Sequence, residues 1–228
     1  MAPLYRGNNF TCPIENRSYR KFLPYGRINP RSNALCPGSL SLERHRLLWL
    51  FLKAKTNFFS DNLKVLHIAP ELCFMKKFEK MPNLDYVTAD LESPLAKVKM
   101  DIHEVPFADN TFDVIFCNHV MEHVLDDIKA MNELRRVMKP TGWAVVQVPF
   151  FYPLKEETFE DSEITGSRDR EKAFGQDDHV RMYGKDYPER LREAGFTVRE
   201  DNFVQSLSAK DIERFVLPPD EVIFYCTK

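Results

Sequence analysis

Short apolar segments that suit buried strands alternate with segments of helical period from Lys64 onward. The expected strands are residues 65–68, 84–90, 98–101, 112–117 and 143–148, and the expected helices between them are 72–80 and 124–138. This alternation is typical of a parallel sheet whose helices cover both faces. It predicts an α/β fold with a doubly wound, mostly parallel sheet.

A long polar stretch at residues 150–184 interrupts this rhythm. A connection of this length inside a compact domain is typical of a lid or a binding loop, or else is disordered. A helix is then expected over 185–193, before Gly195, and two final strands at 196–199 and 221–226. We interpret 150–184 as a lid-like insertion in a domain that covers residues 61–228.

The first 60 residues differ in composition and charge from the rest of the chain. Residues 1–40 are rich in Pro, Asn and Arg and are predicted to be loop-dominated, whereas Ser41 is predicted to cap a helix over 41–57. Residues 1–55 hold ten Lys and Arg against two acids, a charge of +8, although the whole chain carries −2. We interpret 1–60 as a basic N-terminal extension.

Several compositional features bear on the location of the protein. The longest apolar run, Leu47–Leu52, is far shorter than a membrane span, and the first residues lack the apolar core of a signal peptide. The five cysteines are scattered and odd in number, as suits a reducing compartment. We therefore expect a cytoplasmic protein with no membrane partner.

Acidic residues stand at the ends of two expected strands. In an open parallel sheet the ligand crevice lies outside the carboxyl ends of the strands. Asp90 ends the second strand, where a carboxylate can accept both hydroxyls of a ribose, and Asp101 ends the third, where it can accept the exocyclic amine of an adenine. The alternative is that each acid is a solvated strand terminus or a helix cap.

The stretch from Val65 to Pro149 resembles the class I S-adenosylmethionine-dependent methyltransferases, in particular their type 11 group. The segments that carry the resemblance are Val65-Leu-His-Ile-Ala-Pro-Glu71, Tyr86-Val-Thr-Ala-Asp90, Met100-Asp-Ile-His-Glu-Val-Pro-Phe-Ala-Asp-Asn-Thr-Phe-Asp113, Asn118-His-Val-Met-Glu-His123 and Glu133-Leu-Arg-Arg-Val-Met-Lys-Pro-Thr-Gly142. The resemblance implies a Rossmann-like sheet of seven strands whose last strand is antiparallel to its neighbours. A further string, Asp178-His-Val-Arg-Met-Tyr-Gly184, resembles bacterial members of the group.

The same resemblance implies S-adenosylmethionine as cofactor and S-adenosylhomocysteine as product. The implied cofactor-binding residues are His67, Ala69, Pro70, Glu71, Asp90, Leu91, Asp101, Ile102, Asn118 and His119.

The chain departs from the family at the turn after the first strand. The family has an acid followed by a Gly-x-Gly turn there, but this chain has His67 in the acid position and Ala69, Glu71 and Cys73 in the turn. A residue with a side chain adopts positive φ only at a cost. Two outcomes are open. Either the loop takes another path and Glu71 pairs with the cofactor's ammonium group, or cofactor binding is lost and the fold remains as a scaffold.

Two histidines are candidate bases for removing a proton from the methyl acceptor. His119 follows the fourth strand, and His179 lies at the end of the insertion beside Arg181 and Tyr183, which are predicted to bind substrate. An ordinary polar turn is the alternative for the second group. Arg44 and Arg46 are predicted to meet an anionic substrate, with a solvated helix face as their alternative.

The N-terminal extension contains two incomplete metal-binding motifs. Cys12-Pro-Ile-Glu15 and Cys36-Pro-Gly-Ser39 resemble two knuckles of a zinc ribbon, each missing its second cysteine. We interpret them as a ribbon that has lost its metal, and expect no metal in the protein.

Three functions compete on this basis. The first is a methyltransferase that acts on a small acceptor, anionic or sugar-like. The second is an RNA methyltransferase that uses the basic extension, in which Tyr5, Phe10, Tyr19, Phe22 and Tyr25 are interleaved. The third is a non-catalytic protein on the same fold.

Overall fold

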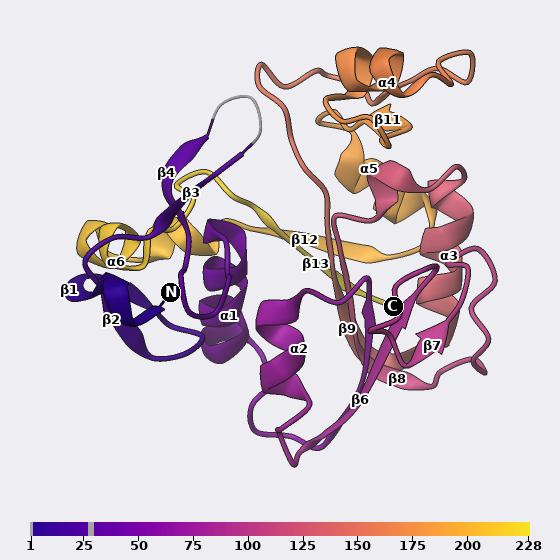
Figure 1. Cartoon of the computed structure of the whole chain (residues 1–228). Helices are drawn as coiled ribbons and strands as arrows, with labels where there is room; N and C mark the ends of the chain where they lie inside the picture. Colours follow the sequence, from indigo (N-terminus) through magenta and orange to yellow (C-terminus); the bar gives the residue numbers. More distant parts are fainter. Residues whose placement is uncertain (1, 27–29) are drawn as a thin grey trace. The chain divides into compact units, whose positions relative to one another are not determined.

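The computed structural model describes residues 2–26 and 30–228, so Arg27, one of the basic residues counted above, lies outside it. The chain forms two compact units (Figure 1). The first unit comprises Met1–Asn62, Glu71–Asn83 and Asp201–Ile223, and the second comprises Leu63–Pro70, Leu84–Glu200 and Phe224–Lys228. The units therefore do not follow the expected boundary at residue 60, because two later segments join the N-terminal residues.

A seven-stranded sheet runs through the second unit in the order β12-β13-β9-β8-β5-β6-β7. Its strands are β5 (Leu63–Ile68), β6 (Leu84–Asp90), β7 (Val98–Lys99), β8 (Phe112–Asn118), β9 (Met138–Gln147), β12 (Thr197–Asp201) and β13 (Ile223–Thr227). The strands from β9 to β7 pair in parallel, whereas β13 is antiparallel to β9. The predicted α/β fold, with seven mostly parallel strands and an antiparallel last strand, is confirmed.

The central strands are buried almost throughout. In β8 only one of the seven residues, Asp113, is not fully buried, and the last six residues of β9 are all buried. Continuous burial of this kind is expected of strands covered on both faces, and it explains why their sequences are unbroken apolar runs.

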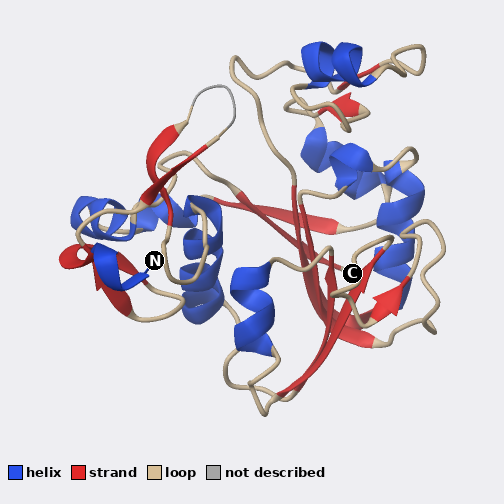
Figure 2. Ribbon diagram, in the orientation of Figure 1, coloured by secondary structure: helices blue, strands red, loops and turns tan. Residues whose placement is uncertain are grey.

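Helices α3 (Asp127–Val137) and α5 (Tyr187–Glu193) pack against each other on one side of this sheet (Figure 2). Asp126 caps α3 by accepting a hydrogen bond from the backbone N–H of Lys129. Between β6 and β7 the described chain forms only turns, because seven residues are too few for a crossover helix. Within residues 2–26 and 30–228, no helix combines the length and apolar character needed to cross a bilayer.

The first unit contains short strands where loops were expected. Antiparallel pairs join β1 (Arg6–Cys12) to β2 (Arg17–Tyr19) and β3 (Leu23–Tyr25) to β4 (Arg31–Leu35). The loop-dominated prediction is wrong because strands of three to seven residues leave little periodicity in a sequence rich in Pro and Asn.

The helices of the first unit are η1 (Ala2–Tyr5), α1 (Glu43–Lys55), α2 (Leu72–Phe78), η3 (Phe203–Ser206) and α6 (Ala209–Phe215). The cap predicted for α1 is wrong, because its N-cap residue is Leu42. The hydroxyl of Ser41 instead accepts a hydrogen bond from Ser39.

The insertion at 150–184 is an ordered substructure of the second unit. Strands β10 (Phe159–Glu160) and β11 (Arg181–Met182) pair antiparallel, with α4 (Ser167–Phe174) between them in the sequence. Gly175 ends α4 in the left-handed conformation that suits glycine. The segment therefore has secondary structure of its own.

Candidate functional site

The carboxyl ends of β5 and β8 lie side by side at the middle of the sheet. From β5 the chain turns toward β6, where the N–H of Ala69 donates to the carbonyl of Ala89 at 2.8 Å. From β8 it turns the opposite way, and the N–H of His119 donates to the carbonyl of Gln147 on β9 at 2.7 Å. The two chains thus diverge, and in open α/β sheets such a switch point is where ligands bind.

Both turns contain strained backbone. Ala69 has a φ of 46° and His119 a φ of 55°, values in the left-handed region that favours glycine. The lack of glycine in the first turn therefore does not abolish positive φ, because alanine adopts it. Backbone strain of this kind gathers at functional sites, where the surrounding structure holds it in place.

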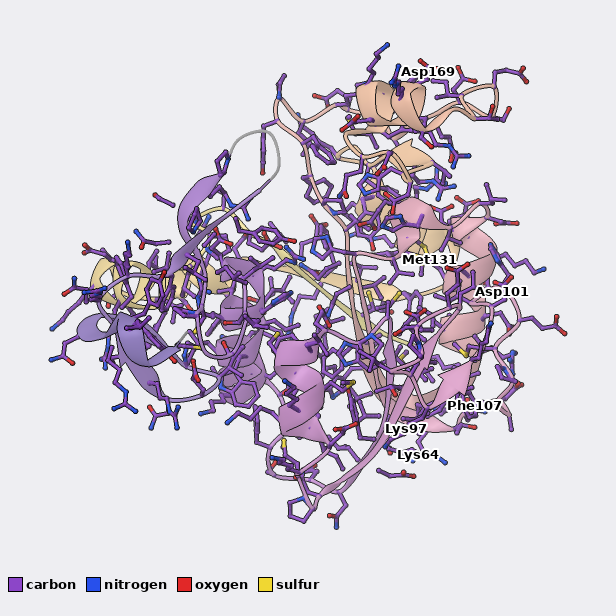
Figure 3. The ribbon with its side chains drawn as sticks, in the orientation of Figure 1. Lys64, Lys97, Asp101, Phe107, Met131 and Asp169 are labelled. Atoms are coloured by element: carbon purple, nitrogen blue, oxygen red, sulfur yellow. The ribbon has the colours of Figure 1, made fainter. Side chains whose placement is uncertain are left out.

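Asp90 and Asp101 each use one carboxylate oxygen within the protein and leave the other without a partner among the described residues. Oδ1 of Asp90 accepts from the N–H groups of Glu92 and Ser93, both at 2.8 Å. Oδ1 of Asp101 (Figure 3) accepts from the backbone N–H and the ring of His103. These hydrogen bonds from His103 lower the pKa of Asp101, so it is charged at neutral pH. Each carboxylate is thus held in place with one acceptor oxygen free for a ligand.

His67 does not fit its predicted role in cofactor binding. Its side chain is fully buried, its Nδ1 lies 2.7 Å from the hydroxyl of Tyr86, and its ring packs against Phe116. Because it has no exposed surface, His67 supports the sheet behind the turn and cannot touch a ligand at the edge.

The other predicted cofactor residues differ widely in exposure. Leu91 is exposed, Pro70 is half-buried, and Ile102 and Asn118 are buried next to the strand ends. Glu71 belongs to the first unit, where its Oε1 lies 3.7 Å from Nε2 of His45.

A buried carboxylate with three histidines around it lies directly after β8, in η2 (Met121–His123) and its surroundings. Glu122 is 2% exposed, and its Oε2 has no hydrogen-bond partner among the described residues. Its Oε1 lies 3.7 Å from Nδ1 of His119 and 4.0 Å from Nε2 of His123. The third histidine is His179, and the atoms that Glu122, His123 and His179 could offer to a metal all lie within 4.8 Å of one another.

Glu122 was not predicted as a site residue from the sequence. A signal was present, because Glu122 lies between two histidines, His119 and His123, that are close to it along the chain. What the spacing could not show is that His179, 56 positions further along the chain than His123, completes the group.

His179 is brought to this cluster but is not positioned to act on a substrate directly. It is fully buried, its Nδ1 lies 3.1 Å from the carbonyl of Phe174, and its Nε2 has no partner among the described residues. Burial lowers the pKa of His179. His119 is different, because 21% of its side chain is exposed.

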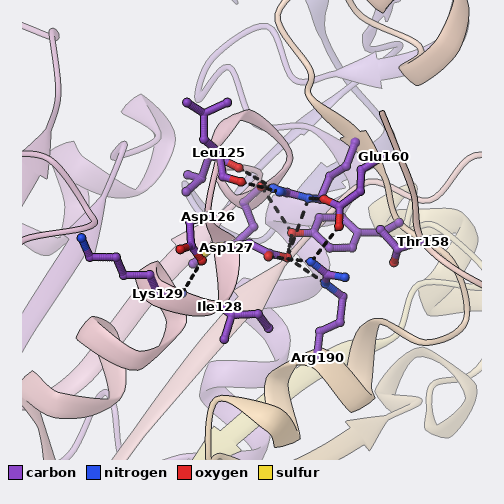
Figure 4. A network of polar contacts seen from close by, with 12 residues as sticks. Leu125, Asp126, Asp127, Ile128, Lys129, Thr158, Glu160 and Arg190 are labelled. Atoms are coloured by element: carbon purple, nitrogen blue, oxygen red, sulfur yellow. Dashed lines mark hydrogen bonds and ion pairs between the residues drawn. The ribbon is translucent and has the colours of Figure 1, made fainter. Parts of the chain in front are cut away.

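Arg181 and Tyr183 were predicted to bind substrate, but the structure buries both in a polar network (Figure 4). Arg181 donates to the carbonyls of Met121, Val124 and Leu125 and to the carboxylate of Glu160. All of its guanidinium nitrogens are engaged, so Arg181 ties the insertion to the segment after η2. The sequence could not indicate this role of Arg181, because these partners are distant from it along the chain.

Asp127 is the acidic centre of the same network. It accepts hydrogen bonds from Tyr183 at 2.7 Å and from Arg190 at 2.7 and 2.9 Å. Burial alone raises the pKa of Asp127, but these hydrogen bonds and the charges of Arg190 and Arg181 hold it below its usual range. The hydroxyl of Tyr183 therefore donates to Asp127 in this structure, inside the protein and not at a surface open to substrate.

Arg46 is a second misassigned arginine, in the first unit. It is fully buried and donates to the carbonyls of Ala34, Ser41, Phe215 and Val216. Those four bonds occupy its guanidinium, so Arg46 has a structural role. Arg44 differs, because its buried Nε has no hydrogen-bond partner among the described residues.

The incomplete zinc-ribbon motifs form one cluster in the first unit. Glu15 Oε1 accepts hydrogen bonds from the hydroxyl of Tyr19, the thiol of Cys36 and the backbone N–H of Ser39. The hydrogen bond from Cys36 lowers the pKa of Cys12 to about 6, although burial opposes this shift. The polar groups of this cluster therefore satisfy one another.

Comparisons with known proteins agree with this fold. Residues 68–146 match the family described as "Methyltransferase domain". An uncharacterized protein of Methanocaldococcus jannaschii is 45% identical over 69 residues, 30% of each chain. A tRNA U34 carboxymethyltransferase of Nautilia profundicola is 26% identical over 128 residues, 56% of this chain and 39% of the relative. The chain thus spans well under half the length of these curated relatives.

Among solved structures, an S-adenosylmethionine-dependent methyltransferase from Mesorhizobium loti aligns with a TM-score of 0.52 and 14% identity. The alignment covers 80% of this chain and 98% of that chain. At this identity the likeness establishes a common fold.

The left-handed backbone of Ala69, in the turn after β5, predicts how a glycine there changes stability. Replacing Ala69 with glycine should raise the free energy of unfolding by about 0.5–1 kcal/mol, because the relief of left-handed strain exceeds the added chain entropy. Ala96, an alanine in a turn without positive φ, provides the control, and Ala96→Gly should lower stability. Urea denaturation measures both, and equal losses in the two variants would contradict the strained turn.

The hydrogen bonds of Arg181 predict a large loss of stability when its side chain is removed. Arg181→Ala should lower the free energy of unfolding by about 3–5 kcal/mol, because it leaves three backbone carbonyls without their donor and removes a buried positive charge beside Asp127. Lys172→Ala, on the exposed surface of α4, should change stability by less than about 0.5 kcal/mol. Comparable stability of the two variants in urea would show that the network does not hold the insertion in place.

Proposed function

We propose that this chain, whose residues 68–146 match a methyltransferase-domain family, is a class I S-adenosylmethionine-dependent methyltransferase that transfers a methyl group to a small hydroxyl-bearing acceptor of anionic or sugar-like character. The observation that carries the proposal is the switch point between β5 and β8, where each strand is followed by a turn with left-handed backbone. Asp90 ends β6 and Asp101 lies two residues after β7, at the carboxyl ends of the next two strands of the same sheet.

The residues at this edge suit S-adenosylmethionine. The free oxygen of Asp90 is positioned to accept a ribose hydroxyl, and that of Asp101 to accept the adenine amine. The half-buried Ala69–Pro70 turn remains for the methionine part of the cofactor. When bound, the cofactor supplies a methyl group on a positively charged sulfur, which is the electrophile of the reaction.

We assign to His119 the role of the base that takes a proton from the methyl acceptor. It stands at the end of β8, it is partly exposed, and its Nδ1 faces the carboxylate of Glu122. An imidazole nitrogen that meets an acceptor hydroxyl can take the proton that this hydroxyl loses during methyl transfer. His179, which is fully buried, is left without contact to the substrate.

The charge of the first 55 residues favours an anionic acceptor. These residues hold ten Lys and Arg against two acids, and an excess of positive charge attracts anionic molecules.

RNA is the second candidate substrate. The basic extension favours it, and one relative is named as a tRNA-modifying enzyme. Against it, Tyr19 and Phe22 are buried in the first unit, so two of the five aromatic residues cannot stack on bases. We therefore rank the small acceptor first.

Cofactor binding is the first test of this proposal. Isothermal titration calorimetry with S-adenosylhomocysteine should detect binding, and Asp90→Ala should weaken it about 10–100-fold, because a hydrogen bond to a charged group is lost. Asp85→Ala changes an exposed carboxylate on the same strand that pairs only with Lys64, and it should bind like the unmodified chain. Absence of binding at millimolar ligand would reject both enzymatic functions and leave the non-catalytic one.

RNA binding is tested separately by retention on immobilised RNA at increasing salt. The small-acceptor proposal predicts weak retention that is lost at physiological ionic strength. Tight retention with a steep salt dependence would instead favour the RNA methyltransferase.

A further inference from the structure

The buried position of Glu122 is not explained by the protein groups around it. A carboxylate that leaves water costs several kcal/mol unless it is paired and hydrogen-bonded. Within the part of the chain that the structure describes, Glu122 has no Lys or Arg partner, and the imidazole nitrogens of His119 and His123 lie 3.7 and 4.0 Å from its Oε1. Those distances are too long for hydrogen bonds.

The distances between these side chains are close to those between the ligands of a single metal ion. Nitrogen and oxygen donors lie about 2.0–2.2 Å from a bound transition metal, so two donors on a tetrahedral ion are about 3.4 Å apart. The donor atoms of Glu122, His123 and His179 lie within 4.8 Å of one another. A small inward movement of these side chains brings them to ligand spacing.

His123 and His179 each have an oxygen atom near Nδ1, as histidines that bind a metal through Nε2 do. Nδ1 of His179 lies 3.1 Å from the carbonyl of Phe174, and Nδ1 of His123 lies 3.3 Å from a carboxylate oxygen of Asp178. An outer acceptor at Nδ1 fixes the tautomer and leaves the lone pair on Nε2. In His179 that Nε2 is buried without a partner among the described residues, and in His123 it faces Glu122.

We infer that Glu122, His123 and His179 bind one divalent transition-metal ion, a departure from the metal-free protein expected from the sequence. Two imidazoles and one carboxylate are a donor set for Zn²⁺, Fe²⁺, Mn²⁺ or Co²⁺ and leave coordination positions open. The cysteine cluster of the first unit is the weaker candidate, because its groups already satisfy one another.

The ion has a role that rests on the proposed function. A divalent metal lowers the pKa of a hydroxyl that coordinates to it. An acceptor oxygen in an open position of this site would therefore lose its proton more readily. This narrows the acceptor class to molecules with a hydroxyl that can bind a metal.

The test uses the chelator-treated full chain and Co²⁺, whose visible spectrum distinguishes thiolate from imidazole and carboxylate ligands. We expect about one Co²⁺ per chain, with ligand-field bands and no thiolate-to-metal band, and Mg²⁺ should not compete at equal concentration. A thiolate band, or no binding, would overturn the inference.

Variants localise the ion. Asp178→Asn removes the negative charge that faces Nδ1 of His123, on an exposed residue, and should weaken Co²⁺ binding about 10–100-fold. Glu122→Gln should weaken Co²⁺ binding further, because it removes the charge of a ligand. The amide has the same shape as the carboxylate, so the fold should be retained, and circular dichroism checks this. Asp177→Asn, the exposed neighbour, should bind like the unmodified chain. Unchanged Co²⁺ affinity in both Asp178→Asn and Glu122→Gln would also overturn the inference.

S-adenosylhomocysteine affinity, measured on the same samples, separates the two proposals. If Co²⁺ does not bind but S-adenosylhomocysteine does, the metal site is wrong and the proposed function stands. If Co²⁺ binds at Glu122 and S-adenosylhomocysteine does not, the metal site stands and the proposed function is wrong.

Discussion

Four consecutive residue pairs join β5 to β8 in parallel, from Val65 with Val114 to Ile68 with Cys117. The candidate site depends on this pairing, because it makes the two strands end at the same level and sends their following turns in opposite directions. Ala69 and His119, the first residues beyond the sheet, both take left-handed backbone there. The buried, unbroken strands hold that strain in place.

Two buried carboxylates of the second unit, Asp127 and Glu122, have surroundings of different electrostatic character. Around Asp127, two arginines and a tyrosine satisfy a buried carboxylate and tie the insertion to the segment after η2. Around Glu122, the ion-pair partners among the described residues are histidines, and Oε2 of Glu122 and Nε2 of His179 have no described hydrogen-bond partner. The first arrangement is complete as a structural element. The second lacks a positive charge, which is why we propose that it binds a cation.

Much of the sheet could be predicted from the sequence because its signals are local. Each central strand is a short apolar run, and Asp90 and Asp101 mark the ends of two of them. The strands of the first unit were missed because three to seven residues with Pro and Asn leave too little pattern.

The roles of several arginines could not be predicted, since they depend on distant backbone. Arg46 and Arg181 look like surface cations in the sequence, but each donates to carbonyls that only the fold brings near: Arg46 to residues 215 and 216, and Arg181 to residues 121–125. Glu122 was missed for the same reason, because His179 joins it through the insertion.

The central claim is that one sheet edge binds the methyl donor beside a metal site. A crystal structure of the chain with S-adenosylhomocysteine and Mn²⁺, with anomalous scattering to locate the metal, tests both parts together. We predict ligand density along Ala69, Asp90 and Asp101 and one anomalous peak between Glu122, His123 and His179. Ligand bound away from this edge, with no peak beside Glu122, would contradict the account.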